Sequence, residues 1–523
     1  MDRLRDPQVA AKNPKIHQTL LNPAKINNQT GPVPTAPSLS ETERGRLNKY
    51  LRDARRPAPV SVPRCARRSS AEAAPLSLAQ EQLFYRAQHS ADEPPFYNEV
   101  ITIHRRGTLD AAIIERCLLE IVRRHEIWRT TFEEVNGWPV QIVRPAPTEL
   151  SVPVLDLTGL SKSEQETRVL RSVGNLAQRP FDLLRGPLLR FLLIRLTESS
   201  HRLVLVAHQS IVDGVSAYQI LPTELAALYG AFSKGNPSPL AEPAIQFADY
   251  AVWQRNQVNT EAIDREMRYW SDRLTDELPV LQWPEGRDRT KSYSHRGVIR
   301  PFAFTGKVSE ALKATAKREG VTLFMTLLSG FVALLRDYTG QKDILVGTLS
   351  PAGRKRTELQ ELLGYFLNPV ALRFDLSSNP TFSELLQQTR DVVSEAISHD
   401  DVPLEVVAKK LGVASGSADP LPFSVAISLQ PRVPEALRAE WDVTSMDAGN
   451  GGTMWNLYLA FIDCPDGVFG RAQYNSDIFR EETIARMLTD LEMLLRRCSS
   501  QPHLRLSDLY KRDNSDEDDR AND

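Results

Sequence analysis

The stretch Leu203-Val204-Leu205-Val206-Ala207-His208-Gln209-Ser210-Ile211-Val212-Asp213-Gly214 decides the fold of this chain. Its first five residues are continuously apolar, which is typical of a strand buried on both faces of a sheet. A mostly helical pattern follows over 215–229, where Pro222 is expected to kink or interrupt the helix. The polar residues 208–214 therefore connect a strand to a helix, and their side chains are expected to project from a rigid sheet into a cleft.

Helix and strand patterns alternate on both sides of this stretch, over about 76–505. This alternation predicts two α/β halves, about 76–250 and 251–505. In the first half, helices are expected at 78–88 and 110–124 and strands at 99–104, 189–196 and 202–207. In the second half, helices are expected at 309–318, 321–337, 382–397 and 481–495, and strands at 298–304, 343–347, 370–374, 423–429, 457–461 and 468–473.

Composition excludes several classes of function. The chain has 64 Lys and Arg against 66 Asp and Glu, so its net charge of -2 gives no general attraction to nucleic acid or to acidic membranes. No signal peptide and no run of 18 apolar residues is found, and the protein is expected to be soluble and cytoplasmic. Four cysteines without a CxxC pair argue against a zinc site or a disulfide framework. Cys117 falls in an apolar helical stripe and is expected to pack in a core.

Both ends of the chain differ in composition from the middle. Residues 1–75 are rich in Pro and polar residues and are expected to be flexible, with one short helix beginning at the capping-box pair Ser40 and Glu43. Several arginines between 55 and 68 form a basic linker. Residues 506–523 are expected to form an acidic, disordered tail. Each end is interpreted either as a docking segment for carrier proteins or other synthetases, or as a solvated tether.

Short distinctive segments accompany the 208–214 loop along the chain. In order over 76–505, they resemble the motifs of the condensation domains of nonribosomal peptide synthetases, whose active-site signature is HHxxxDG. Any one of these matches is weak, whereas the ordered set is specific. The segments, which resemble S-x-A-Q-x-R-L, RHExLRTxF, DYAxWQ, GTPVAGR, GYFVN and DVPFE, are Leu76 to Leu83, Arg124 to Phe132, Phe247 to Gln254, Gly347 to Arg354, Gly364 to Asn368 and Asp401 to Glu405.

The resemblance implies a fold and a set of roles. The family fold is α/β, with two chloramphenicol-acetyltransferase-like lobes in a V-shaped pseudo-dimer and a central tunnel. By the same resemblance, His208 is structural, Gln209 occupies the catalytic position and Asp213 holds the loop through an ion pair with Arg354. Gly214 would let the backbone turn and offer an amide near the reacting thioester. Asp213 as a helix N-cap and Gly214 as a turn residue are compatible with these roles.

One residue departs from the signature, because Gln209 stands where the family has its second, catalytic histidine. A neutral imidazole can accept a proton near pH 7, whereas a carboxamide does not titrate in this range. Gln209 can orient a substrate amine but cannot act as a general base, whose loss typically costs about 10²–10⁴-fold in rate. Positioning of two bound reactants could still support catalysis.

The leading hypothesis is a condensation-type acyltransferase that joins a carrier-bound acyl or peptidyl thioester to an amine, or less favourably to a hydroxyl. The substrates would be carried on phosphopantetheine arms of peptidyl or acyl carrier proteins or of other synthetase subunits. The protein itself is expected to bind no cofactor and no metal. The alternative is a non-catalytic condensation-like domain that recruits carrier proteins or tailoring enzymes. Epimerisation also needs the missing histidine, and heterocyclisation needs a DxxxxD signature, so both are disfavoured. No adenylation or carrier-protein motif is found, and a free-standing unit is expected.

Overall fold

The computed structural model describes residues 73–89, 94–257, 260–274, 278–283, 294–412, 421–444 and 449–509. The expected short helix near Ser40, the basic linker and the acidic end from residue 510 lie outside these residues. The described fold begins with β1 (Ala74–Pro75) and ends with the short helix α15 (Leu506–Leu509). Because Leu506 and Leu509 are buried, the expectation of a disordered tail from 506 is corrected for these first four residues.

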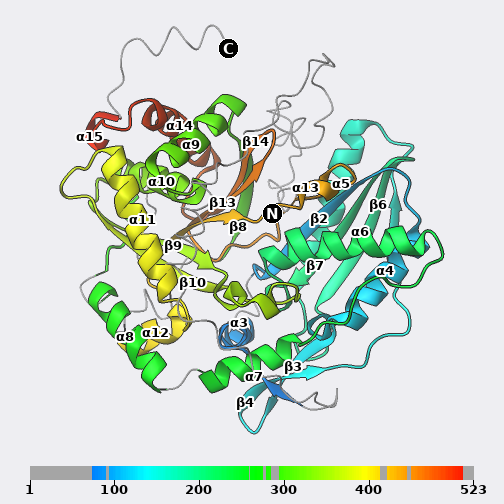
Figure 1. Ribbon diagram of the computed structural model, residues 1–523. Coiled ribbons are helices and arrows are strands. Elements are labelled where there is room, and N and C mark those ends of the chain that lie inside the picture. The colour runs from blue at the N-terminus through cyan, green and yellow to red at the C-terminus, as the bar shows by residue number, and fades with distance from the viewer. Residues whose placement is uncertain are drawn as a thin grey trace, which may run out of the picture.

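The first half is built on a five-stranded sheet with the strand order β12-β2-β7-β6-β5. Strand β7 runs antiparallel to both β2 and β6. Helices α4 and α6 lie together across one face of this sheet (Figure 1). The elements are β2 (Asn98–Arg106), α4 (Ala111–Arg124), β5 (Val154–Asp156), α5 (Lys162–Ala177), β6 (Leu189–Thr197), β7 (Ser200–His208) and α6 (Leu221–Phe232).

The apolar strand at the centre of this sheet is buried on both faces, as its sequence predicted. Leu203 and Leu205 point into the core that α4 and α6 cover, whereas Val204 and Val206 pack against α5 on the opposite face. Side chains of a strand alternate between faces, so continuous apolarity has a direct structural cause here. The strand therefore holds the following loop at a fixed position.

The helical pattern after the loop is continuous but changes its winding. Residues Ser216–Ile220 form a π-helical turn, η4, and α6 begins at Leu221. Pro222 lies within the first two positions of α6, where its missing N–H removes no intrahelical hydrogen bond of α6. The expected interruption thus takes the form of a widened turn rather than a break.

The second half is built on a six-stranded sheet with the strand order β10-β9-β11-β13-β14-β8. Its helices α9, α10, α11 and α14 pack around a separate hydrophobic core (Figure 1). The strands are β8 (Gly297–Ala303), β9 (Asp343–Ser350), β10 (Asn368–Asp375), β11 (Val425–Gln430), β13 (Leu457–Cys464) and β14 (Gly467–Asn475). The helices are α9 (Gly306–Glu319), α10 (Leu323–Thr339), α11 (Phe382–Ser398), α12 (Leu404–Leu411) and α14 (Glu481–Ser500).

Several elements connect the two halves. Strand β12 (Trp441–Thr444) comes from the second half but pairs with β2 in the first sheet. Helix α7 (Phe247–Gln257) spans residue 250, where the boundary between the two halves was expected. That boundary stays a prediction. A small third sheet and further helices complete the described chain: α3 (Leu78–His89), β3 (Thr130–Val135), β4 (Trp138–Val143), α8 (Thr260–Leu274) and α13 (Glu435–Arg438).

Two other sequence expectations can be compared with the structure. Cys117 is fully buried in the first core, as its stripe predicted, and burial raises the pKa of its thiol to about 12. Among the described residues, no single helix is long and apolar enough to cross a membrane. Only α9 and α10 taken as a pair reach that length and composition, and they are bent by 105°.

Candidate active site

The loop from His208 to Gly214 leaves the end of β7 between the two sheets. Its first turn is a short 3₁₀ helix, Gln209–Ile211, and the backbone N–H of Gln209 donates to the carbonyl of Tyr97 at 2.8 Å. Because β2 follows Tyr97 directly and pairs with β7, the loop is fixed to two neighbouring strands of the first sheet. Gln209 is 8% exposed, and its side chain lines a cavity.

Asp213 and Arg354 form a buried, two-pronged ion pair. The guanidinium donates from Nε and Nη2 to the two carboxylate oxygens, each at 2.8 Å. The backbone N–H of Ser216 also donates to Asp213 Oδ1 at 2.8 Å, and that of Phe366 donates to Oδ2 at 3.3 Å. Four donors therefore occupy the hydrogen-bond accepting positions of this carboxylate. Its contacts are those expected of both an N-cap and a loop anchor.

Arg354 links Asp213 to the second half of the chain. It lies in a short 3₁₀ turn, Ala352–Lys355, and donates to the carbonyls of Leu359 and Leu362 at 3.0 Å each. Its guanidinium also stacks over the ring of Phe366, 4.4 Å from the centroid. The pair predicted from the sequence is thus embedded in a hydrogen-bonded network that joins the two halves of the molecule.

Gly214 lies where the two halves approach each other closely. A Cβ atom at this position would lie 2.6 Å from Gln430 Oε1 and 3.3 Å from Pro431 Cδ. Gln430 ends β11, so the loop and the second sheet nearly touch here. The absence of a side chain lets the backbone of the loop face this boundary.

His208 is enclosed and has a defined tautomer. It is 4% exposed, and its Nδ1 accepts a hydrogen bond from the backbone N–H of Ser210 at 3.3 Å, with Ser210 Oγ 2.8 Å away. The neutral ring therefore carries its proton on Nε2. Burial lowers the pKa of His208 to about 3, so the ring stays uncharged at neutral pH. These contacts fit a loop-positioning side chain.

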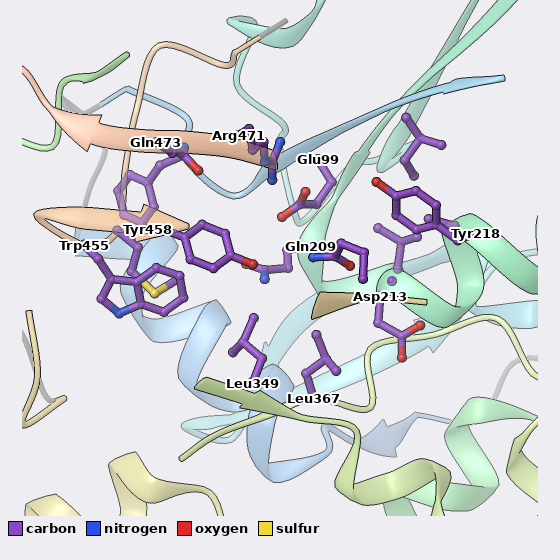
Figure 2. Close-up of a pocket in the computed structure, with 17 residues that line it drawn as sticks. Glu99, Gln209, Asp213, Tyr218, Leu349, Leu367, Trp455, Tyr458, Arg471 and Gln473 are labelled. Carbon is purple, nitrogen blue, oxygen red and sulfur yellow. The ribbon is translucent and has the colours of Figure 1, made fainter. Parts of the chain in front are cut away.

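The cavity has a volume of about 80 Å³ and is walled by both sheets. Figure 2 shows the Glu99 carboxylate, the Gln209 carboxamide and the Tyr458 hydroxyl directed toward one space, with Arg471 beside Glu99. The apolar part of the wall includes Leu349, Leu367 and Trp455. The remaining lining residues are Phe96, Ile101, Val212, Asp213, Gly214, Ala217, Tyr218, Gln430, Met454 and Gln473.

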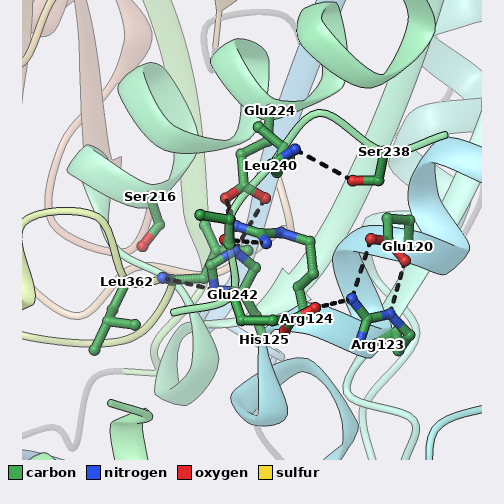
Figure 3. Close-up of polar contacts among 12 residues, drawn as sticks. Glu120, Arg123, Arg124, His125, Ser216, Glu224, Ser238, Leu240, Glu242 and Leu362 are labelled. Atoms are coloured by element: carbon green, nitrogen blue, oxygen red, sulfur yellow. Dashed lines mark hydrogen bonds and ion pairs between the residues drawn. The ribbon is translucent and has the colours of Figure 1, made fainter. Parts of the chain in front are cut away.

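A second buried ionic cluster joins α4 to α6. Glu224 of α6 accepts hydrogen bonds at 3.0 Å from Arg124 Nη2 and His125 Nε2 (Figure 3). Burial would raise the pKa of Glu224, but the His125 and Arg124 contacts bring it below its ordinary value. His125 Nδ1 lies 3.5 Å from the backbone N–H of Leu363. His125 therefore joins α4, α6 and the second half, which is a structural role.

Sequence reasoning missed most of the cavity wall. Glu99 is the first residue of an expected strand, and its charge next to the apolar residues Val100 and Ile101 is the available signal. Tyr458 and Arg471 belong to β13 and β14, more than 200 residues along the chain from Gln209. Ordinary strand periodicity gives no indication that these strands face the loop.

Comparison with known proteins identifies the family. The model of the condensation domain matches residues 70–518. The chain belongs to the condensation domain family. Chondramide synthase cmdD of Chondromyces crocatus is 37% identical over 441 residues, which are 84% of this chain but 11% of that synthase. The chain thus spans about a tenth of the length of this much larger relative.

Solved condensation-domain structures share the fold. The first condensation domain of the CDA synthetase matches with a TM-score of 0.73 at 20% identity, over 84% of this chain and 98% of that one. The X-domain from teicoplanin biosynthesis matches with a TM-score of 0.71 at 24% identity, over 86% and 99%; it has also been solved in a complex with OxyB. The expected pair of chloramphenicol-acetyltransferase-like lobes is confirmed, and Gln209 is a departure within a complete family fold.

Proposed function

We propose that this condensation-family protein forms an amide bond between a carrier-bound acyl or peptidyl thioester and an amine acceptor. The observation that carries the proposal is the loop itself. Gln209 and Gly214 line the cavity between the sheets, and the Asp213–Arg354 pair anchors the loop beneath them. The buried pair holds Gln209 and Gly214 at the cavity, as the orientation of two substrates there would require.

Catalysis here would rest on orientation. The two substrates would enter on phosphopantetheine arms of separate carrier proteins or synthetase subunits and meet at Gln209. Its carboxamide can accept a hydrogen bond from the amine and hold it against the thioester carbonyl. The backbone amide of Gly214 would lie near the carbonyl oxygen, where charge develops during attack.

The test is an incubation with two loaded carrier proteins followed by mass analysis of the product. We expect a product whose mass combines the acyl group and the amine. This product should form only when both loaded carriers are present. Leu349→Trp is the matched variant, because it fills the cavity without altering the loop. Product formation by this variant at the wild-type rate would show that the reaction does not use this site.

A second candidate function is recruitment without catalysis. It is favoured by Gln209, which lacks the proton-accepting ring of the family, and by the fold shared with the X-domain that binds OxyB. In this case the protein would bind carrier proteins or a tailoring enzyme and give no condensation product. A binding measurement alongside the product assay separates the two: partner binding unaffected by Leu349→Trp and no product would support recruitment.

A further inference from the structure

Glu99 places a carboxylate in the same cavity as Gln209. It is the second residue of β2 and pairs with Ala207, and its neighbour Asn98 pairs with His208. Strand pairing therefore holds Glu99 level with the last residues before the loop. Its side chain extends toward the space that Gln209 and Tyr458 also face (Figure 2). An acidic side chain at this place is unexpected in a strand whose neighbours Val100 and Ile101 are buried.

The surroundings of Glu99 favour its acting as a base. Burial raises the pKa of Glu99, and the Arg471 guanidinium offsets part of that rise. A carboxylate with a raised pKa is a stronger proton acceptor than one in water. The titratable or charged groups around it come from every neighbouring element: Arg471 of β14, Tyr458 of β13, Tyr365 before β10, Tyr97 before β2, His208 of β7 and Asp213 of the loop.

Asp213 and Tyr458 of the cavity wall, and His208 beside it, are poor proton acceptors. Four donors occupy Asp213, and the burial of His208 keeps its ring neutral with Nδ1 already engaged. Burial raises the pKa of Tyr458, whose hydroxyl lies 2.6 Å from Ser428 Oγ, so it stays a neutral phenol. Gln209 carries a carboxamide, and the Arg471 guanidinium is a hydrogen-bond donor without an accepting atom. Glu99 is the one carboxylate among the described lining residues that has free accepting capacity.

We propose that Glu99 is the proton acceptor for the acceptor amine, in place of the histidine that Gln209 replaces; this inference rests on the proposed amide-forming function. The amine nitrogen attacks the thioester carbonyl and gives a proton to the Glu99 carboxylate as the C–N bond forms. The C–S bond then breaks, and the leaving thiolate takes the proton from Glu99. Amine and thioester thus become amide and thiol, and the carboxylate is regenerated.

The test compares Glu99→Gln, Glu99→Asp and wild type in amide formation with loaded carriers, measured as kcat and KM across pH. Glu99→Gln keeps the shape of the side chain and removes the base. We expect kcat of Glu99→Gln to fall about 10²-fold or more, with KM little changed. The wild-type kcat should decline at low pH, where Glu99 becomes protonated, and this decline should be absent from the variant. Glu99→Asp should restore part of the rate. Titration of the amine itself is common to all variants, so the difference between profiles reports Glu99.

The matched control is Glu149→Gln, which removes an exposed carboxylate of the same half outside the cavity and should leave kcat unchanged. Thermal melting of each variant checks that it is folded. Wild-type product with an unchanged kcat and pH profile in folded Glu99→Gln would overturn this inference and leave the proposed function standing. A rise in KM alone would assign Glu99 to amine binding and would also overturn it. Absence of product from the wild type would overturn both proposals.

Discussion

At the scale of residues, neighbouring positions of one loop have opposite environments. His208 is enclosed, neutral and hydrogen-bonded within the loop, whereas Gln209 faces the cavity. Asp213 has all its accepting capacity used by Arg354 and two backbone amides. Consequently the chemistry of the site depends on the groups directed into the cavity. Gln209 is the residue of the loop that directs a long polar side chain into it.

Gln209→His should preserve the fold, because the two side chains are polar and of similar reach. If the protein catalyses weakly for lack of a base, this change should raise kcat on the order of 10-fold or more, by restoring a group that titrates near neutral pH. Gln209→Ala should slow the wild-type reaction by removing the orienting carboxamide. Product formation that neither change affects would argue against any role for residue 209, and steady-state rates with loaded carriers measure both.

His208 should make the protein less stable as pH falls. Its pKa is about 3 in the folded protein, against an ordinary value of about 6.5 in the unfolded chain, so only the unfolded chain takes up this proton between those values. Stability is therefore fully present above pH 6.5 and is lost by up to about 1.4 kcal/mol per pH unit on acidification. Urea unfolding from pH 7 to pH 5 should show a smaller decline for His208→Asn; parallel declines would contradict the assignment.

At the scale of elements, α4 shows how local signals are built into the tertiary structure. The helix begins at Ala111, one residue after the predicted start, with Asp110 as its N-cap accepting from the backbone N–H groups of Ala112 and Ile113 at 2.8 and 3.3 Å. Its apolar stripe, which includes Cys117, is fully buried. The last turn then delivers Arg124 and His125 to Glu224. The N-cap, the buried apolar stripe and the ionic contacts thus follow one another along the helix, from its first turn to its last.

Asp110→Ala should lower the free energy of unfolding by about 1 kcal/mol, because two backbone N–H groups of the first turn lose their acceptor. Asp110→Asn is the control, since asparagine caps helices about as well as aspartate. The urea midpoints of the two variants and the wild type provide the measurement. Equal loss in both variants would mean that the charge of Asp110, and not its capping oxygen, stabilises the helix.

At the scale of the whole molecule, the halves are connected at several places. Strand β12 crosses to the first sheet, where Trp441 packs in the first core and lies under the Arg105 guanidinium. The Asp213–Arg354 pair crosses in the other direction, from the loop to the second half. These connections fix the walls of the cavity relative to each other. The site therefore depends on the assembly of both halves and not on either alone.

Arg354→Ala should lower the free energy of unfolding by about 3–5 kcal/mol, because it leaves the Asp213 carboxylate buried without its counter-charge. The double variant Asp213→Ala, Arg354→Ala should lose less than the two single losses added together. Arg300→Ala is the matched control: its pair with Glu481 has the same 2.8 Å distance but is exposed, so about 0.2–1 kcal/mol is expected. Equal losses of unfolding free energy for Arg354→Ala and Arg300→Ala would show that the Asp213–Arg354 pair does not stabilise the contact between the two halves.

The sequence by itself determined the strand–loop–helix unit around Gln209 and the family, and the family resemblance implied Arg354 as the candidate partner of Asp213. These follow from short-range periodicity and from ordered motifs, both of which are present in the linear chain. Only the tertiary structure decided that β12 joins the first sheet and that Glu99, Tyr458 and Arg471 meet at Gln209. The physical reason is that the pairing of distant strands depends on the packing of whole sheets, whereas a polar residue in a strand has the same local pattern whether it faces solvent or a cavity.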